Sequence, residues 1–258
     1  MNRIKTAFSK GKAFIPFFTC GDPDLETTEQ LVLAAAEAGA DLIELGIPFS
    51  DPTAEGPVIQ GANMRALAGG VTTDLIFGLV RRLREQTQVP LVFMTYANVV
   101  FSYGTERFLT QAAQAGVDGL ILPDVPFEEK EEFAAPCREH GLVLISMVAP
   151  TSEGRVAQIA REAEGFLYCV SSMGVTGVRS QITTDVGAMV ALAKQANPNV
   201  PCAIGFGIST PEQAAAMAAK SDGAIVGSAI VKLCGQYKEA CVPYVKEYVK
   251  SMKDAVRR

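Results

Sequence analysis

Acidic side chains are the residues best placed for proton transfer in this sequence. The single histidine, His140, stands near the end of an expected helix, where a histidine ordinarily favours the helix dipole rather than reacting. Acid–base work therefore falls to carboxylates. Glu44 stands out because it lies inside the apolar run 41–46, near the C-terminal end of an expected strand. If that strand alternates, Glu44 shares a face with Leu42, and loss of water there would raise the pKa of its carboxyl group.

Other interpretations of these carboxylates stay open on the residues alone. Glu44 can also be an exposed side chain at a frayed strand end, or a buried one held in a structural ion pair. Asp51 and Glu55 follow in a loop whose conformations are limited by Pro48, Pro52 and Pro57. Such a loop can hold a second carboxylate near the first, although an ordinary solvated loop carboxylate is the more frequent outcome.

Lysine chemistry is the weaker alternative. Many barrel enzymes that cleave aldols use a lysine Schiff base, but no lysine lies inside an expected strand here. Lys232 follows residues 227–228 on an expected helix and is predicted to cap that helix or to face solvent.

Glycines after three late strands give a second signal. Residues 174–177 follow the sixth strand, 205–207 follow the seventh, and Gly227–Ser228 follows the eighth, where a helix begins. Backbone N–H groups at a helix start face anions, and barrels often bind phosphate in the loops after strands seven and eight. The pattern predicts a phosphorylated substrate without saying which one.

The elements that must position these residues alternate almost from end to end. Short apolar runs typical of parallel strands covered on both faces occupy residues 14–19, 41–46, 91–95, 119–122, 142–147, 166–170, 202–205 and 224–226. Helix patterns lie between them at residues 27–38, 74–85, 105–115, 128–140, 155–164, 185–196 and 211–220.

Eight strand–helix units favour one closed (β/α)₈ barrel over residues 1–258, because right-handed crossovers bring the last strand round to the first. An open doubly wound sheet is disfavoured, since no Gly-x-Gly-x-x-Gly follows the first strand. Two long connections, 46–57 and 171–180, follow C-terminal strand ends, on the face where barrel active sites lie.

Composition excludes some partners. The net charge is -5, 48% of the residues are hydrophobic, and no basic cluster marks a nucleic-acid or anionic membrane surface. No apolar signal region and no run approaching the roughly 20 residues of a membrane span occur. Six cysteines without a C-x-x-C pair read as reduced thiols. We therefore expect a cytoplasmic protein.

Several motifs together resemble the tryptophan synthase α subunit family. They occur in family order between about Arg3 and Lys232, and they are residues 14–17 (FIPF), 21–23 (GDP), 44–52 (ELGIPFSDP), 96–98 (YAN), 124–126 (DVP), 174–177 (GVTG) and 205–209 (GFGIS). The resemblance implies a single TIM barrel with an extra N-terminal helix, and neither metal nor cofactor in this chain.

The implied reaction is the retro-aldol cleavage of indole-3-glycerol phosphate to indole and glyceraldehyde 3-phosphate, a carbon–carbon lyase step of tryptophan biosynthesis. By this resemblance Glu44 is the catalytic acid and base. The second catalytic carboxylate of the family is an Asp in the stretch LADGP, which reads TAEGP at residues 53–57 here. Glu55 thus takes its place, with the charge kept and the reach lengthened by one methylene.

The resemblance also implies the binding residues. Phe17, Tyr96 and Phe206 would line the indole pocket, and the phosphate site would be formed by Gly177, Gly207, Gly227 and Ser228. Thr176 would pack on the loop after strand two when substrate binds. The family usually has Arg after the Ser that precedes this segment, whereas this chain has Ser171-Ser172.

A partner is implied as well: a β subunit that uses pyridoxal phosphate, joined in an allosteric α₂β₂ heterotetramer through which indole passes. Residues 96–101 and 124–127 would dock to it. Two other functions remain open at this point. One is a binding and allosteric module whose own chemistry has decayed, and the other is a free-standing lyase that releases indole without a partner.

Overall fold

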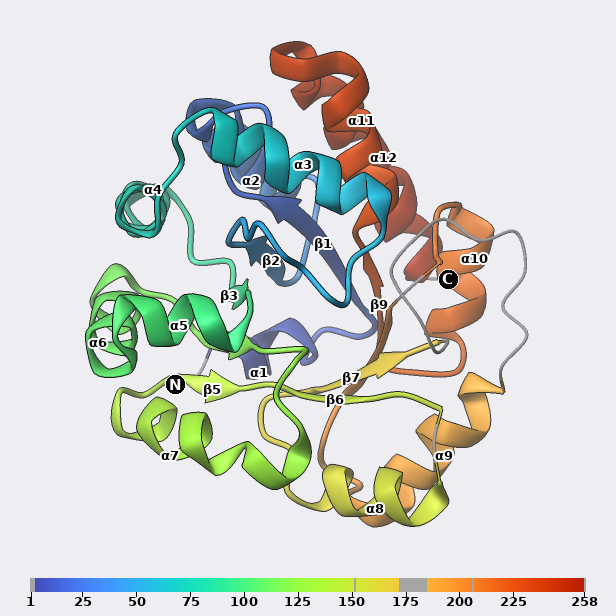
Figure 1. Cartoon of the computed structure of the whole chain (residues 1–258). Coiled ribbons are helices and arrows are strands. Elements are labelled where there is room, and N and C mark those ends of the chain that lie inside the picture. The colour runs from blue at the N-terminus through green and yellow to red at the C-terminus, as the bar shows by residue number, and fades with distance from the viewer. Residues whose placement is uncertain (1–2, 151, 172–184, 206, 258) are drawn as a thin grey trace.

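The fold is a ring of parallel strands. The computed structural model describes residues 3–150, 152–171, 185–205 and 207–257 (Figure 1). All strand pairs are parallel, and the hydrogen-bonded order is β5-β4-β3-β2-β1-β9-β8-β7-β6. The strands are β1 (Ala13–Thr19), β2 (Ile43–Gly46), β3 (Leu91–Met94), β4 (Gly119–Ile121), β5 (Val143–Leu144), β6 (Ser146–Val148), β7 (Leu167–Val170), β8 (Cys202–Gly205) and β9 (Gly223–Val226).

The ring closes through a bend in the chain between β5 and β6. Residues 142–147 were expected to form one strand, but β5 pairs with β4 and β6 pairs with β7, with only Ile145 between them. A strand that turns the corner of a closed barrel cannot stay straight against both neighbours. Counting β5 and β6 as one bent strand gives the eight strand positions of the expected (β/α)₈ barrel, which is confirmed.

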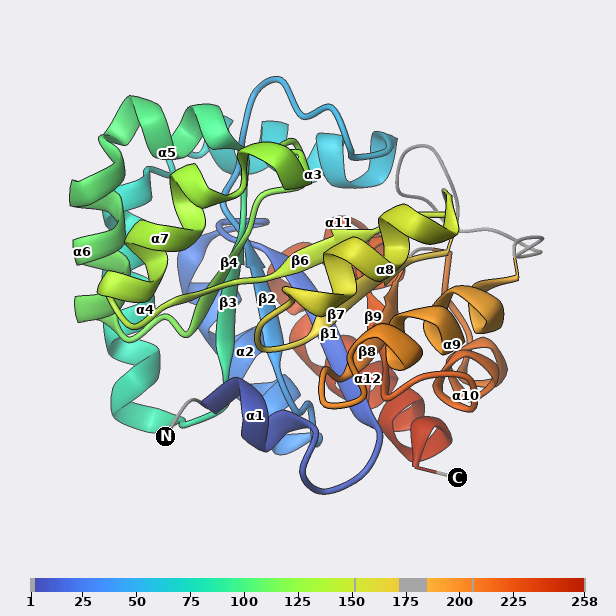
Figure 2. The ribbon, with the colours of Figure 1, turned by 90° about the horizontal axis from the view of Figure 1, so that it is seen from below.

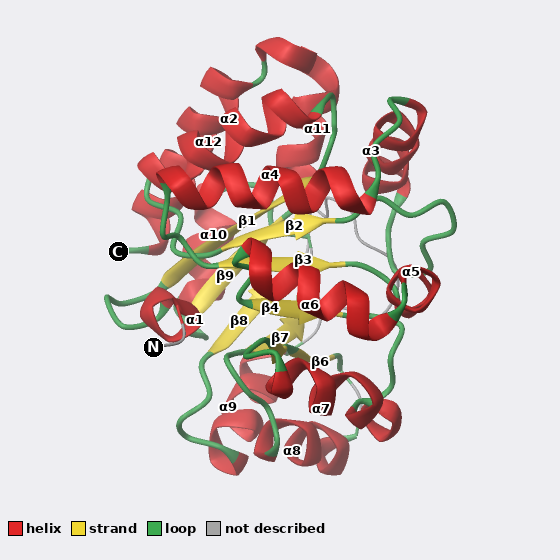
Figure 3. Cartoon of the chain, turned by 90° about the vertical axis from the view of Figure 1, so that its left-hand side faces the viewer, coloured by secondary structure: helices red, strands yellow, loops and turns green. Residues whose placement is uncertain are grey.

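Helices surround the strands on the outside (Figures 1 and 3). In the described ranges they are α1 (Arg3–Ala7), α2 (Leu25–Glu37), α3 (Pro57–Ala68), α4 (Thr73–Gln86), α5 (Ala97–Tyr103), α6 (Thr105–Ala115), α7 (Glu131–Glu139), α8 (Glu153–Arg161), α9 (Val186–Ala196), α10 (Pro211–Ala218), α11 (Ser228–Tyr237) and α12 (Val242–Val256), with short 3-10 helices η1 (Phe127–Glu129) and η2 (Lys238–Ala240). None of the described helices is long and apolar enough to span a membrane.

Three helices have no counterpart in the helix patterns expected from the sequence: α3, α5 and α12. In α3, Gly61 and Asn63 interrupt the helical pattern, and both have poor intrinsic helix propensity. The expected helix 128–140 instead divides into η1 and α7. The prediction for His140 is confirmed, because it caps the C-terminal end of α7, with its Nε2 atom 2.9 Å from Oε1 of Glu106.

Two apolar layers hold the barrel. The inner layer consists of side chains that point into the ring, among them Ile15, Leu42 and Val92, and the larger outer layer lies between strands and helices. Ile4 and Ala7 of α1 belong to the inner layer, so the expected N-terminal helix closes one end of the barrel. Figure 2 shows α1 and both termini at that end and α3 and α5 at the other. The second end, where the strands finish, is left for the site.

An ion pair fastens α12 beneath β1 and β2. The Lys253 ammonium contacts the Asp41 carboxylate and donates to the backbone oxygen of Lys12 at 2.9 Å. Asp41 also accepts a hydrogen bond from the Phe14 amide at 2.8 Å. The side chains of Lys253 and Asp41 are only 5% and 16% exposed. The pair therefore ties the C-terminal helix to the start of the segment that carries Glu44.

Replacing Lys253 by Met should destabilise the protein by about 3 kcal/mol, because the nearly buried carboxylate of Asp41 loses its cation. Urea unfolding at pH 7 measures the change. The matched control is Lys250→Met on the exposed face of α12, which should cost less than about 0.5 kcal/mol. Equal stability of the two variants would show that the pair does not fasten the helix.

Candidate active site

Glu44 lies on β2 with its side chain inside the barrel, as the alternation with Leu42 predicts. Its register partners are Phe17 on β1 and Val92 on β3. The residue is 1% exposed, and its Oε1 atom has no hydrogen-bond partner among the described residues. Burial raises the pKa of the carboxyl group to about 8. Glu44 is therefore a neutral acid near pH 7, and it has neither the exposure of a frayed strand end nor an ion-pair partner among the described residues.

Glu55 lies in the loop between β2 and α3 and is 8% exposed, so it is not the solvated carboxylate that a loop position usually gives. Asn63 of α3 donates its side-chain amide to Oε2 at 2.7 Å. Burial raises the pKa of Glu55 and the bond from Asn63 lowers it, which leaves it at about 7. Asp51, in the same loop, is exposed.

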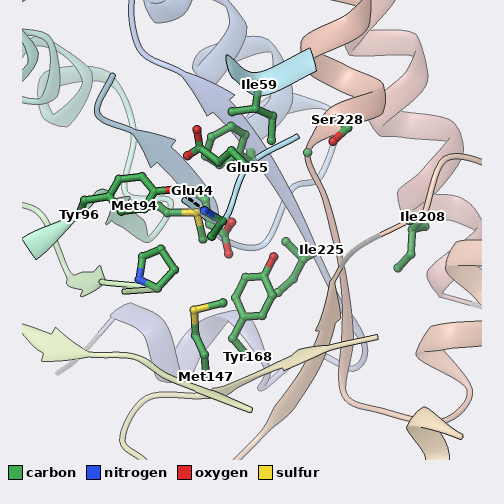
Figure 4. Close-up of a pocket in the computed structure, with 15 residues that line it drawn as sticks. Glu44, Glu55, Ile59, Met94, Tyr96, Met147, Tyr168, Ile208, Ile225 and Ser228 are labelled. Carbon is green, nitrogen blue, oxygen red and sulfur yellow. Dashed lines mark hydrogen bonds between the residues drawn. The ribbon is translucent and has the colours of Figure 1, made fainter. Parts of the chain in front are cut away.

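Both carboxyl groups face one cavity at the end of the barrel where the strands finish (Figure 4). Among its described lining residues there is no Lys, Arg or His. The cavity is lined by Phe17, Glu44, Ala54, Glu55, Ile59, Met94, Tyr96, Pro123, Met147, Tyr168, Gly207, Ile208, Ile225, Gly227 and Ser228. A largely apolar cavity with a few polar groups suits a small organic ligand.

Seven of the ten site residues predicted from the sequence therefore meet in one place, and they are Phe17, Glu44, Glu55, Tyr96, Gly207, Gly227 and Ser228. The other three, Thr176, Gly177 and Phe206, lie outside the described residues. Lys232, which was weighed for Schiff-base chemistry, is exposed on α11 and does not line the cavity. No group of three or more described His, Cys, Asp or Glu side chains could hold a metal ion.

Tyr96 fixes the loop that carries Glu55. Its hydroxyl accepts a hydrogen bond from the backbone amide of Ala54 at 3.1 Å, and its ring packs against Phe49 at 5.3 Å between centroids. Burial raises the pKa of the Tyr96 hydroxyl and the negative charge of Glu55 raises it further, so this group stays a neutral phenol. The residue expected as an indole wall thus also positions the second carboxylate.

Sequence reasoning missed the wall opposite the loop, which Tyr168, Met147 and Ile225 form; in Figure 4 Glu44 lies between Glu55 and Tyr168. Tyr168 is buried on β7, and burial together with the charge of Glu44 raises the pKa of its hydroxyl. The available signal was the period of two along the strands, which places Tyr168 in the same inward set as Phe166 and Val170.

Two glycines make room for these aromatic rings. A Cβ atom on Gly46 would lie 2.5 Å from the Phe17 ring, and one on Gly205 would lie 2.5 Å from the Tyr168 hydroxyl. Real side chains do not approach so closely, so any larger residue would displace a cavity wall. These glycines serve the apolar part of the cavity.

The opposite corner of the cavity is the N-terminus of α11. Gly227 is the residue before the helix and has no side chain that could cap it, and Ser228 is the first residue of the helix. Gly207 also lines the cavity, and its backbone has φ +75°, in the left-handed region that favours glycine. The first N–H groups of a helix lack intrahelical partners and attract anions. The corner suits a phosphate.

Comparison with known proteins identifies this arrangement. The family model of the tryptophan synthase alpha chain matches residues 4–257. The chain belongs to the tryptophan synthase alpha chain family. It is 47% identical to the alpha chain of Lacticaseibacillus casei over 99% of this chain and 96% of that one, and 51% identical to the alpha chain of Citrifermentans bemidjiense over 93% and 92%.

Solved structures of the family have the same fold. The alpha subunit from Legionella pneumophila str. Paris matches with a TM-score of 0.90 and 38% identity, covering 99% of this chain and 98% of that one. A structure from Pyrococcus furiosus that concerns the structural basis of mutual activation of the tryptophan synthase a2b2 complex matches with a TM-score of 0.86 and 33% identity, covering 95% of this chain and 99% of that one. This member of the tryptophan synthase alpha chain family is therefore a lyase of tryptophan biosynthesis that cleaves indole-3-glycerol phosphate.

Burial of Glu44 predicts a pH dependence of stability. The unfolded chain loses the proton of this carboxyl group near its ordinary pKa, whereas the folded chain keeps it up to about pH 8. Stability from this group therefore falls as the pH rises from about 4.5 through 8. The Glu44→Gln variant has no titrating group at this position. Its free energy of unfolding in urea should therefore rise relative to that of the wild type between pH 5 and pH 8.

The matched control is Glu139→Gln, an exposed position on α7, whose difference from the wild type should stay constant over the same range. A constant difference for Glu44→Gln as well would contradict the raised pKa.

Proposed function

We propose that Glu44 is the acid and base of the retro-aldol cleavage and that Glu55 binds the indole N–H. The observation that carries the proposal is the unpartnered, buried Oε1 atom of Glu44 in a cavity that also holds Glu55 and no described cation. An orphaned buried polar atom is costly, so it is accounted for when a ligand supplies its partner.

The cleavage needs one proton delivered and one removed. Glu44 is protonated near pH 7 and gives its proton to C3 of the indole ring, which disrupts the aromatic electron system. The resulting carboxylate takes the proton of the hydroxyl group on the adjoining glycerol carbon. The electron pair of the O–H bond forms the aldehyde C=O as the bond between this carbon and C3 breaks. The indole ring then recovers its aromaticity. Indole and glyceraldehyde 3-phosphate leave, and Glu44 is again protonated.

Glu55 assists from the other side of the ring. While C3 is protonated the ring carries positive charge, which the N–H shares, and a carboxylate that accepts from it is favourable. Phe17 and Tyr96 supply apolar and aromatic walls for the flat ring. Phe206 is proposed to join them, although it lies outside the described residues.

The phosphate of the substrate binds at the N-terminus of α11, against Gly207, Gly227 and Ser228. Gly177 belongs to the same proposed site, and Thr176 to the loop that closes over it; both lie outside the described residues. Remote binding of the phosphate places C3 near Glu44, because holding reactants in a fixed geometry lowers the barrier.

The partner in this proposal is a tryptophan synthase β subunit. The Pyrococcus furiosus structure concerns an a2b2 complex, and we propose the same α₂β₂ assembly here. The exposed ring of Phe101 lies within residues 96–101 of the proposed docking face. Pyridoxal phosphate belongs to the β subunit, and this chain needs no cofactor of its own. A single domain over residues 1–258 and a cytoplasmic location complete the proposal.

Glu44→Gln keeps the shape of the side chain and removes its titrating proton, so indole release should fall by at least ~10²-fold. Single-turnover release of indole from indole-3-glycerol phosphate, with and without a β subunit, measures it. Unfolding in urea checks that the variant folds. Turnover close to that of the wild type in folded Glu44→Gln would refute the role of Glu44. An inactive wild-type chain would instead favour the decayed, purely allosteric module.

The kcat of variants at Glu55 should follow the charge of the side chain. Glu55→Asp keeps the carboxylate, so it should retain more activity than Glu55→Gln, which we expect to lose at least ~10-fold because the neutral amide supports a charged ring less well. Steady-state kcat at pH 7.5 gives the order. Equal kcat for Glu55→Gln and the wild type would show that this position takes no part in catalysis.

A further inference from the structure

Helix α3 is fixed from outside the cavity. The Arg65 guanidinium donates to both carboxylate oxygens of Asp22, with both N–O distances 2.8 Å. This pair joins α3 to the loop after β1. The buried residues of α3 are Ile59, Ala62, Asn63 and Ala66. Asn63 is the polar member of this set, at 3% exposure. A buried amide in a helix interior is unfavourable unless its hydrogen bonds are satisfied.

The amide of Asn63 is satisfied by Glu55. Its Nδ2 atom donates to Oε2 of the carboxylate at 2.7 Å, the short distance typical of a bond to a charged acceptor. Gln60, one turn earlier on α3, donates to the backbone oxygen of Glu55 at 2.7 Å. Helix α3 thus holds both the backbone and the carboxylate of Glu55.

The charges around Glu55 make its ionisation depend on the Asn63 amide. The titratable groups that face the cavity are Glu44 from β2, Tyr96 at the start of α5 and Tyr168 from β7. All of these become negative when they ionise, and no described lining residue is a cation. Charge on Glu55 therefore depends on neutral donors, and the Asn63 amide is the one that lowers its pKa against burial.

We propose that Asn63 is a positioning residue for the cleavage: its amide anchors Oε2 of Glu55, turns the other oxygen toward the indole N–H and keeps the carboxylate ionised. This inference rests on the proposed function, in which Glu55 accepts from the substrate. The hydrogen bond from Asn63 gives the two acids different roles. Glu44 Oε1 has no described donor and Glu44 keeps its proton, whereas Glu55 is held as a carboxylate. The same bond also fixes a side chain that is one methylene longer than the Asp of the family motif.

The test is the pH profile of kcat for indole release in Asn63→Leu and Asn63→Ala. Leu fills the volume without a donor, and Ala, which also lacks a donor, is the smaller variant in case Leu prevents folding. Loss of the amide raises the pKa of Glu55, so the acidic limb of the profile should move to higher pH by about one unit, the size of one lost bond to a charged group. The basic limb, which belongs to Glu44, should stay in place.

Two controls isolate the carboxylate. Gln60→Met removes the bond to the backbone oxygen alone, so its acidic limb should not move. In a Glu55→Gln background the acidic limb that belongs to Glu55 is absent, and adding Asn63→Leu should leave the basic limb in place. A merely structural asparagine would lower the melting temperature in every background and leave the limbs where they are.

An acidic limb that stays in place or moves to lower pH in both Asn63 variants would overturn the inference. The proposed function is judged separately. If the wild type releases indole and Glu44→Gln does not, the lyase chemistry stands whatever Asn63 does. If the wild type releases none, the function fails, and the inference fails with it.

Discussion

The buried carboxyl group of Glu44 is the constraint on which the rest of the site depends. It occupies an inward position of β2, between Phe17 and Val92, where the layers below it are apolar. With no cation among the described lining residues, the low-energy form is the neutral acid. The interior of the barrel below, closed by α1, supplies the apolar burial that offsets such a group. The buried position of Glu44 is thus sufficient to make it a proton donor near neutral pH.

The second carboxylate is held by a different principle. Glu55 lies on a loop, and its geometry comes from hydrogen bonds made by Tyr96 on one side and by α3 on the other. Two acids in one cavity consequently have different surroundings, one without a described donor at Oε1 and one with an amide at Oε2. Pairs of titratable groups with unequal environments are how one site runs acid and base chemistry at the same pH.

The sequence predicted the barrel, the face of Glu44 and the cavity end, because strand alternation and the chain order of strands and helices are local patterns. It missed what depends on three-dimensional closure. The bend between β5 and β6 is required by the ring, and Tyr168 becomes a wall only when β7 faces β2. On residues alone Glu55 was interpreted as a solvated side chain, because the residues that bind it, Gln60 and Asn63, lie on a helix that the pattern did not show.

The most direct test of the account is a titration of the Glu44 carboxyl group itself in the protein without substrate. Glutamate labelled with ¹³C at the side-chain carboxyl carbon, with Glu44→Gln to assign the resonance, gives its midpoint by NMR. We expect a midpoint near pH 8, well above the ordinary value for a glutamate side chain. A midpoint near the ordinary value of about 4.3 would mean that Glu44 is ionised at neutral pH and cannot be the resting acid.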